Sequence, residues 1–131
     1  LISMKKNKLY KIIDSSHSEN ISKYTIRIDF SNSILKGHFP KRPVLPGVVM
    51  CDIIKDLASV KLGVEIQLIN AKNIKFMKMI IPSKNEKYII NISINKENNY
   101  KIKATISQNN EIYFKLSGEY YDKKICQKNS V

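Results

Sequence analysis

Residues 37–47 read GHFPKRPVLPG, and residues 48–54 continue this stretch with VVMCDII. Proline fixes φ at about −65° and favours an extended conformation in the residue before it, so Pro40, Pro43 and Pro46 should stiffen the loop. After Gly47 no Pro or Gly occurs until Gly63, and the first two turns are almost entirely apolar. This pattern predicts a helix over residues 47–62 that enters a core. The loop should therefore deliver His38 to the start of a buried helix.

The start of that helix is suited to binding a negatively charged oxygen. The first N–H groups of a helix lack intrahelical acceptors and carry the positive end of the dipole. Gly47 and Val48 could therefore donate to a carbonyl oxygen that gains negative charge, and Gly47 has no side chain to block a substrate. Asp52 is the only carboxylate between Gly47 and Ile54. One short segment thus holds a candidate base, two backbone donors and an acid.

This stretch resembles the signature of a known enzyme family. Gly37-His38-Phe39-Pro40, followed two residues later by Pro43-Val44-Leu45-Pro46-Gly47 and by an acid fourteen positions after the His, is similar to the motif of the 3-hydroxyacyl-[acyl-carrier-protein] dehydratases of the hotdog fold. In that family the acid is Glu in one branch and Asp in the other, so Asp52 matches in position and role. Chain length and strand order resemble the family over about residues 8–121.

Alternating apolar residues predict strands on both sides of the helix. We expect them at Leu9–Asp14, Lys23–Phe30, residues 65–81, Tyr88–Asn95, Tyr100–Ser107 and Glu111–Tyr121, the last three forming an antiparallel meander. This order predicts an α+β hotdog fold, with one antiparallel sheet wrapped around one long central helix. Because such a sheet cannot cover the helix on every side, we expect a partner subunit to cover the rest.

The 131 residues predict one domain over residues 1–131, with a core at about 8–121 and a disordered tail at 122–131. Met4 is either the native initiator, or Leu1, Ile2 and Ser3 belong to an upstream extension of the protein. No leader and no run of about 18 apolar residues is visible, which favours a cytoplasmic protein with no membrane partner. Cys51 and Cys126 are expected to be free thiols, Cys51 as a core residue rather than a nucleophile.

The formal net charge is +12, but only two of the 23 basic residues are Arg. Much of this charge therefore reflects a Lys-rich composition, and no nucleic-acid-binding motif accompanies it. A basic rim suits an acidic protein partner, and the acyl carrier proteins served by the family that this chain resembles are acidic. We expect acyl carrier protein or coenzyme A thioesters as substrates and no nucleic acid.

The resemblance implies a reaction and an assembly. The enzyme would eliminate water from a 3-hydroxyacyl thioester to give the trans-2-enoyl thioester, in fatty-acid or specialised lipid biosynthesis, without a metal or other cofactor. His38, oriented by the carbonyl of Val44, would remove the C2 proton, and Asp52 would help to protonate the leaving hydroxyl. The family's dimer places the loop His of one subunit opposite the helix acid of the other, so a homodimer or a trimer of dimers is implied.

The residues also allow plainer interpretations. Asp52, Lys55, Asp56 and Ser59 fall at i, i+3, i+4 and i+7, which is typical of a solvated helix face. His38 could serve only to hold the loop, Phe39 either packs beneath the loop or lines the substrate site, and His17 is expected in a polar turn over residues 15–20.

Asp56 stands where many members of the family carry a Gln that braces the acid. This departure suits a specialised pathway, such as one making aryl polyenes. Two further functions stay open. One is a hotdog thioester hydrolase, for which Asp29 is the one candidate acid ahead of the motif. The other is a non-catalytic module that binds acyl carriers.

Overall fold

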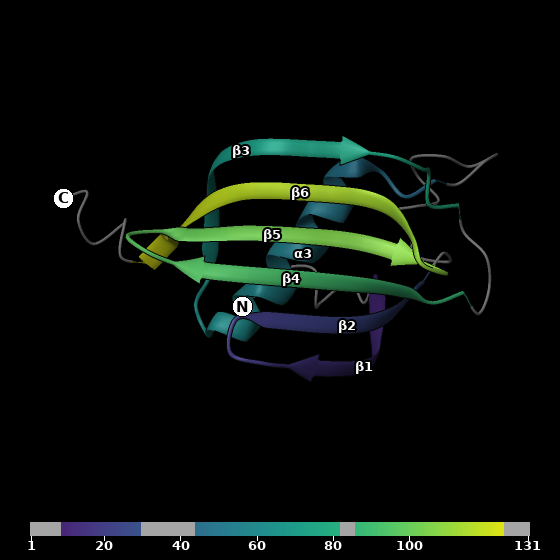
Figure 1. Ribbon diagram of the computed structural model, residues 1–131, viewed down its shortest axis with the longest axis horizontal. Helices are drawn as coiled ribbons and strands as arrows, with labels where there is room; N and C mark the ends of the chain where they lie inside the picture. Colours follow the sequence, from purple (N-terminus) through teal and green to yellow (C-terminus); the bar gives the residue numbers. More distant parts are fainter. Residues whose placement is uncertain (1–8, 30–43, 82–85, 125–131) are drawn as a thin grey trace.

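The computed structural model describes residues 9–29, 44–81 and 86–124. Two strands precede a single helix in this part of the chain, and four strands follow it (Figure 1). The elements are β1 (Tyr10–His17), β2 (Ile21–Ile28), α3 (Gly47–Leu62), β3 (Ile66–Phe76), β4 (Tyr88–Lys96), β5 (Tyr100–Gln108) and β6 (Glu111–Asp122). The predicted α+β class is confirmed.

The six strands form one sheet in the order β1-β2-β4-β5-β6-β3, and every neighbouring pair is antiparallel. Strands β4, β5 and β6 are consecutive neighbours, which confirms the predicted meander. Asn109 and Asn110, both with positive φ, make the two-residue turn between β5 and β6. Figure 1 looks onto the sheet with α3 crossing behind it, so the helix covers one face only.

The core lies between α3 and the sheet face that it covers. Ile53, Ile54 and Leu57 of the helix are fully buried, and they meet alternate residues of the strands. These strand residues include Tyr88, Ile90 and Ile92 of β4, Ile102 and Ile106 of β5, and Phe114 and Leu116 of β6. The helix ends as predicted, because Gly63 adopts a left-handed φ of 73° and its N–H donates to the carbonyl of Ser59 at 2.9 Å.

The largest differences from the expected strands are at the ends of β1 and β3. β1 continues to His17, because Ser15 and Ser16 pair with β2. An irregular register between Ile12 and Asp14 interrupts the alternation there, which hid this extension in the sequence. His17 therefore belongs to a strand rather than a turn, with Nδ1 lying 2.8 Å from Ser22 Oγ.

β3 ends at Phe76, so the second half of the apolar run at residues 74–81 is not a strand. Ile80 in this half is fully buried, and its carbonyl accepts a 2.9 Å hydrogen bond from the N–H of Leu45. Ile80 therefore packs against the chain leading into α3, whereas Met77, Met79 and Ile81 of the same segment remain exposed.

At the other end of the described chain, β6 includes Asp122, and Lys123 N–H donates to the carbonyl of Glu65 at 3.0 Å. The first residues of the expected disordered tail, 122–124, are therefore ordered. Several predictions lie outside the described residues, namely the stiff loop with His38 and Phe39, the roles of Met4 and Cys126, and the remaining tail. The helix of the described chain is not long and apolar enough to cross a membrane.

Candidate active site

The start of α3 is shaped by Pro46 and Gly47. Pro46 precedes the helix with φ −64° and ψ 149°, an extended conformation that proline adopts readily. Its carbonyl accepts the first helical hydrogen bonds, from Val49 N at 3.0 Å and Met50 N at 3.2 Å. The N–H groups of Gly47 and Val48 come before these bonds, at the positive end of the helix dipole. Both donors thus lie at the helix start, and their role in binding a carbonyl oxygen stays a prediction.

The ring of Phe76, at the end of β3, lies directly over Gly47. A Cβ added to Gly47 would lie 2.5 Å from Cζ of that ring, which is closer than any real contact. Phe76 is 60% exposed, and its ring packs against that of Phe114 with centroids 5.1 Å apart. Glycine at position 47 therefore allows an aromatic side chain to approach the helix start.

A cavity of about 310 Å³ opens at the same place. It lies between the segment leading into α3 and the end of β3, and its lining is mostly apolar. The lining residues are Val44, Leu45, Pro46, Gly47, Met50, Phe76, Met77, Lys78 and Met79. Two of the predicted site residues, Val44 and Gly47, are thus brought together on one cavity.

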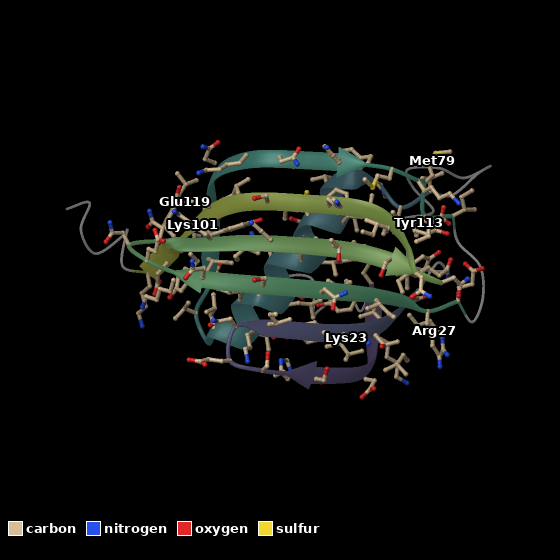
Figure 2. All side chains as sticks on the ribbon, viewed as in Figure 1. Lys23, Arg27, Met79, Lys101, Tyr113 and Glu119 are labelled. Carbon is tan, nitrogen blue, oxygen red and sulfur yellow. The ribbon has the colours of Figure 1, made fainter. Side chains whose placement is uncertain are left out.

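The charge of Lys78 at this cavity is compensated. Its Nζ lies 2.8 Å from Oε1 of Glu111, and this hydrogen bond raises the pKa of Lys78. Figure 2 shows Met79 and Tyr113 at the same end of the sheet, and the Tyr113 ring lies 5.6 Å from Lys78 Nζ. The cavity therefore holds no uncompensated charge from the described residues, which suits an apolar acyl group.

Large apolar side chains remain exposed around this cavity. Val48 is 69% exposed and Met79 65% exposed, and Met77 and Ile81 are also open to solvent. We call Val48, Phe76, Met77, Met79 and Ile81 the apolar rim. Exposed apolar side chains gathered at one site are typical of a surface that another molecule covers.

Asp52 lies further along α3, is half-buried and does not line the cavity.

The neighbour of Asp52, Cys51, is a free thiol, and burial, together with the nearby charge of Asp52, raises the pKa of Cys51. A thiol that is hard to deprotonate is a poor nucleophile, so the interpretation of Cys51 as a packing residue is favoured. Burial also raises the pKa of Tyr120 to about 12.

The prediction of a solvated polar stripe on α3 is wrong for two of its four residues. Asp56 is 1% exposed and Ser59 is 3% exposed. Tyr10 Oη donates to Asp56 Oδ2 at 2.6 Å, and Ser59 Oγ accepts a 3.3 Å hydrogen bond from Ile66 N. Burial, followed by the hydrogen bond and charge of Asp56, raises the pKa of Tyr10. These two polar side chains join the helix to β1 and to the start of β3.

Sequence reasoning missed Phe76, Met77 and Met79 as cavity residues and Tyr10 as the partner of Asp56. The apolar run before Pro82 was the available signal for the first three, but it was interpreted as a strand. No local pattern marks Tyr10, because its contact joins residues 46 positions apart. The relation between His38 and Asp52 lies beyond the described chain and stays a prediction.

Comparison with known proteins agrees with the architecture. A protein-family model described as ApeI-like, ApeI dehydratase, matches residues 14–118. The 3-hydroxyacyl-[acyl-carrier-protein] dehydratase FabZ of Clostridium acetobutylicum is 32% identical over 62 residues, which are 42% of this chain and 44% of FabZ. The chain thus aligns with less than half the length of this curated relative.

Solved structures share the hotdog fold. The dehydratase heterocomplex ApeI:P from Xenorhabdus doucetiae superposes with a TM-score of 0.70 at 18% identity, over 85% of this chain and 96% of that chain. An inactive mutant of the CurJ dehydratase superposes with a TM-score of 0.56 at 11% identity, over 85% of this chain and 41% of that one. The family match covers both the helix start with its cavity and the motif at residues 37–47, which confirms the resemblance drawn from the sequence. The chain belongs to the ApeI-like family of dehydratases.

Proposed function

We propose that this protein eliminates water from a 3-hydroxyacyl thioester and releases the trans-2-enoyl thioester. The observation that carries the proposal is the apolar cavity at the start of α3, where the backbone of Gly47 lies beside room for an acyl group. Membership of a dehydratase family supports the choice of reaction.

Elimination begins with a proton that is hard to remove. The C2 hydrogen of a thioester becomes acidic when the carbonyl oxygen is stabilised as it gains negative charge. In the proposed complex Gly47 N–H donates to that oxygen, with the N–H of Val48 and the helix dipole adding to the positive potential. Because Gly47 has no side chain, a substrate would share the space over this donor with the exposed ring of Phe76.

His38 is proposed as the base and Asp52 as the acid. An imidazole with an ordinary pKa of about 6.5 is mostly neutral at pH 7 and can accept the C2 proton. Val44 lines the cavity, and its carbonyl would orient the imidazole ring of His38. The electron pair of the C2–H bond forms the C2–C3 double bond, the C3–O bond breaks, and the hydroxyl leaves as water with a proton supplied through Asp52.

The proposed active unit contains two chains. Asp52 does not line the cavity of its own subunit, so we propose that it serves the cavity of a partner. The apolar rim would be covered in the same assembly. A second copy of this chain is the proposed partner. ApeI from Xenorhabdus doucetiae occurs in a heterocomplex, which makes a different chain the alternative partner.

The proposed carrier is an acidic acyl carrier protein in the cytoplasm. FabZ is named for substrates on an acyl carrier protein, and the net charge of +12 suits an acidic partner. Kinetics with the same 3-hydroxyacyl group on acyl carrier protein and on coenzyme A would decide which carrier the enzyme uses. The proposal expects the higher kcat/KM with the carrier protein.

The reaction is tested by incubating the purified protein with 3-hydroxyacyl thioesters. Appearance of the conjugated enoyl product, by ultraviolet absorbance and mass spectrometry, is the expected result. Release of free thiol without enoyl product would instead assign hydrolysis. If neither the enoyl product nor free thiol forms with any chain length or carrier, the proposed activity is overturned. The remaining function would then be that of a module that binds acyl carriers.

A further inference from the structure

A groove crosses the sheet face opposite α3. Its volume is about 700 Å³, more than twice that of the cavity at the helix start. Its lining is largely apolar, with Ile21 among the lining residues, and polar side chains stand along it, chiefly Asn91, Ser93, Lys103, Thr105, Lys115 and Ser117. We call this feature the basic groove. It is separate from the candidate active site, because these residues alternate with those that face the helix.

The strand register arranges these side chains in two rows across the sheet. In one row Lys23 pairs with Asn91, Asn91 with Thr105, Thr105 with Lys115, and Lys115 with Lys75. In the next row Ser93 pairs with Lys103 and Lys103 with Ser117. Lys103 and Lys115 are therefore diagonal neighbours on adjacent strands, with their Cα atoms about 7–8 Å apart. Lys23 and Lys75 extend the positive charge to both sides of this pair.

The chain does not neutralise these lysines within the part that the structure describes. The ion pairs there are Lys78–Glu111, Lys101–Glu97 and Lys123–Glu65, and none of them involves a lysine of the two rows. Glu119 lies with Lys101 at one end of the sheet (Figure 2), and together with Glu97 it adjoins the groove, because both line a neighbouring pocket beside Lys103. Glu97 is 3.0 Å from Lys101 there, and Glu119 accepts a 3.0 Å hydrogen bond from Asn99. The groove therefore keeps a positive potential that an external anion can compensate.

The lining favours carboxylates over nucleic acid. Sites for single-stranded nucleic acid combine basic residues with aromatic side chains on which the bases stack, and none of the described residues that line this groove is aromatic. Hydroxyl and amide groups between the lysines can instead donate hydrogen bonds to carboxylates. A second copy stacked on this face would bring the same lysines together, so a copy of this chain does not fit.

We propose that the basic groove docks a carboxylate-rich segment of an acidic protein. Docking on an open surface by lysine point charges is fast and sensitive to salt, which suits a partner that associates and leaves repeatedly. The site is independent of the proposed dehydration, because its residues take no part in that chemistry.

The test measures fluorescence anisotropy of a labelled peptide of alternating Glu and Ala, titrated with the full-length protein at low ionic strength. The Lys103→Gln/Lys115→Gln double variant should weaken binding about five- to tenfold. The matched Lys61→Gln/Lys96→Gln variant loses the same charge outside the groove and should change binding less than about twofold. Added salt should weaken the wild-type complex, and circular dichroism checks that both variants are folded.

Three results would overturn the proposal. The first is failure of the wild-type protein to bind the Glu-Ala peptide. The second is an equal loss of affinity in both double variants, which would indicate net charge rather than a site. The third is binding of a labelled single-stranded DNA at least as tightly as the peptide, with the same loss in the groove variant, which would assign the groove to nucleic acid. Dehydratase kinetics of the Lys103→Gln/Lys115→Gln variant show separately whether the protein eliminates water. A failure of the docking proposal can therefore be told apart from a failure of the proposed dehydration.

Discussion

The hydroxyl of Tyr10 on β1 donates a 2.6 Å hydrogen bond to Oδ2 of Asp56 on α3. Asp56 is almost fully buried and lies one helical turn beyond Asp52. A buried carboxylate is costly unless it is hydrogen-bonded, so this contact holds the edge strand against the helix that carries the proposed acid.

Replacing Tyr10 with Phe should destabilise the fold. The change removes a donor to a buried carboxylate while keeping the ring, and we expect the free energy of unfolding to fall by about 1.5–3 kcal/mol. Urea unfolding followed by circular dichroism measures this. Tyr121→Phe, on a half-buried tyrosine of β6, is the matched control and should change stability by less than about 0.5 kcal/mol. Equal effects of both changes would show that the hydrogen bond contributes little.

Stability should decrease at alkaline pH because of Tyr120. Burial raises its pKa from 10.0 to about 12, so the folded state holds a proton that the unfolded state releases. The stabilisation is fully present below pH 10 and is lost as pH rises through 12. Between pH 10 and 12, the unfolding free energy of the Tyr120→Phe variant should therefore fall less steeply than that of the wild-type protein, by about 1.4 kcal/mol per pH unit. Urea unfolding of both proteins at several pH values measures this difference. Parallel curves for the two proteins would contradict this.

Gly47→Ala should impair the site through Phe76. The new methyl group would meet the end of an exposed ring, which can turn aside but would then leave its place over the helix start. We expect kcat/KM to fall by up to about 100-fold with little change in melting temperature. Adding Phe76→Ala relieves the contact and should recover part of kcat/KM. A Gly47→Ala enzyme with unchanged kinetics would show that close approach to this backbone is not needed.

Phe76→Ala alone should alter the preference for acyl-chain length. Phe76 forms part of the cavity lining, so its removal lengthens the space available to an acyl chain. The ratio of kcat/KM for a longer over a shorter 3-hydroxyacyl thioester should rise by about tenfold. Ile112→Ala removes an apolar side chain of β6 that is partly exposed and does not line the cavity, and it should leave the ratio unchanged.

The sequence predicted the helix and the meander because their signals are local. Pro46, Gly47 and Gly63 mark the ends of α3, and regular alternation marks β4 to β6. The burial of Asp56 was missed because it depends on a partner 46 positions away, whereas the length of β1 was missed for a local reason. A register irregularity concealed the strand, and a buried carboxylate looks like a solvated one until Tyr10 is placed beside it.

The same contrast applies to the site. Gly47 and Val44 were predicted from the motif and do line a common cavity, because neighbouring residues cannot separate far in space. Phe76 and Met79 reach that cavity only through the course of β3 and the segment after it, which no local pattern specifies. The opposition of His38 and Asp52 depends on a second chain and can be tested only in the assembly.

Mixed dimers test the central claim most directly. His38→Ala and Asp52→Asn chains with different affinity tags are coexpressed, the mixed dimer is purified, and its rate of enoyl formation is compared with those of the two inactive parents. If each site takes its His and Asp from different chains, the mixed dimer has one intact site and should show about half the wild-type rate. A mixed dimer as inactive as its parents would contradict a site shared between chains, and full activity of either parent would contradict the proposed chemistry.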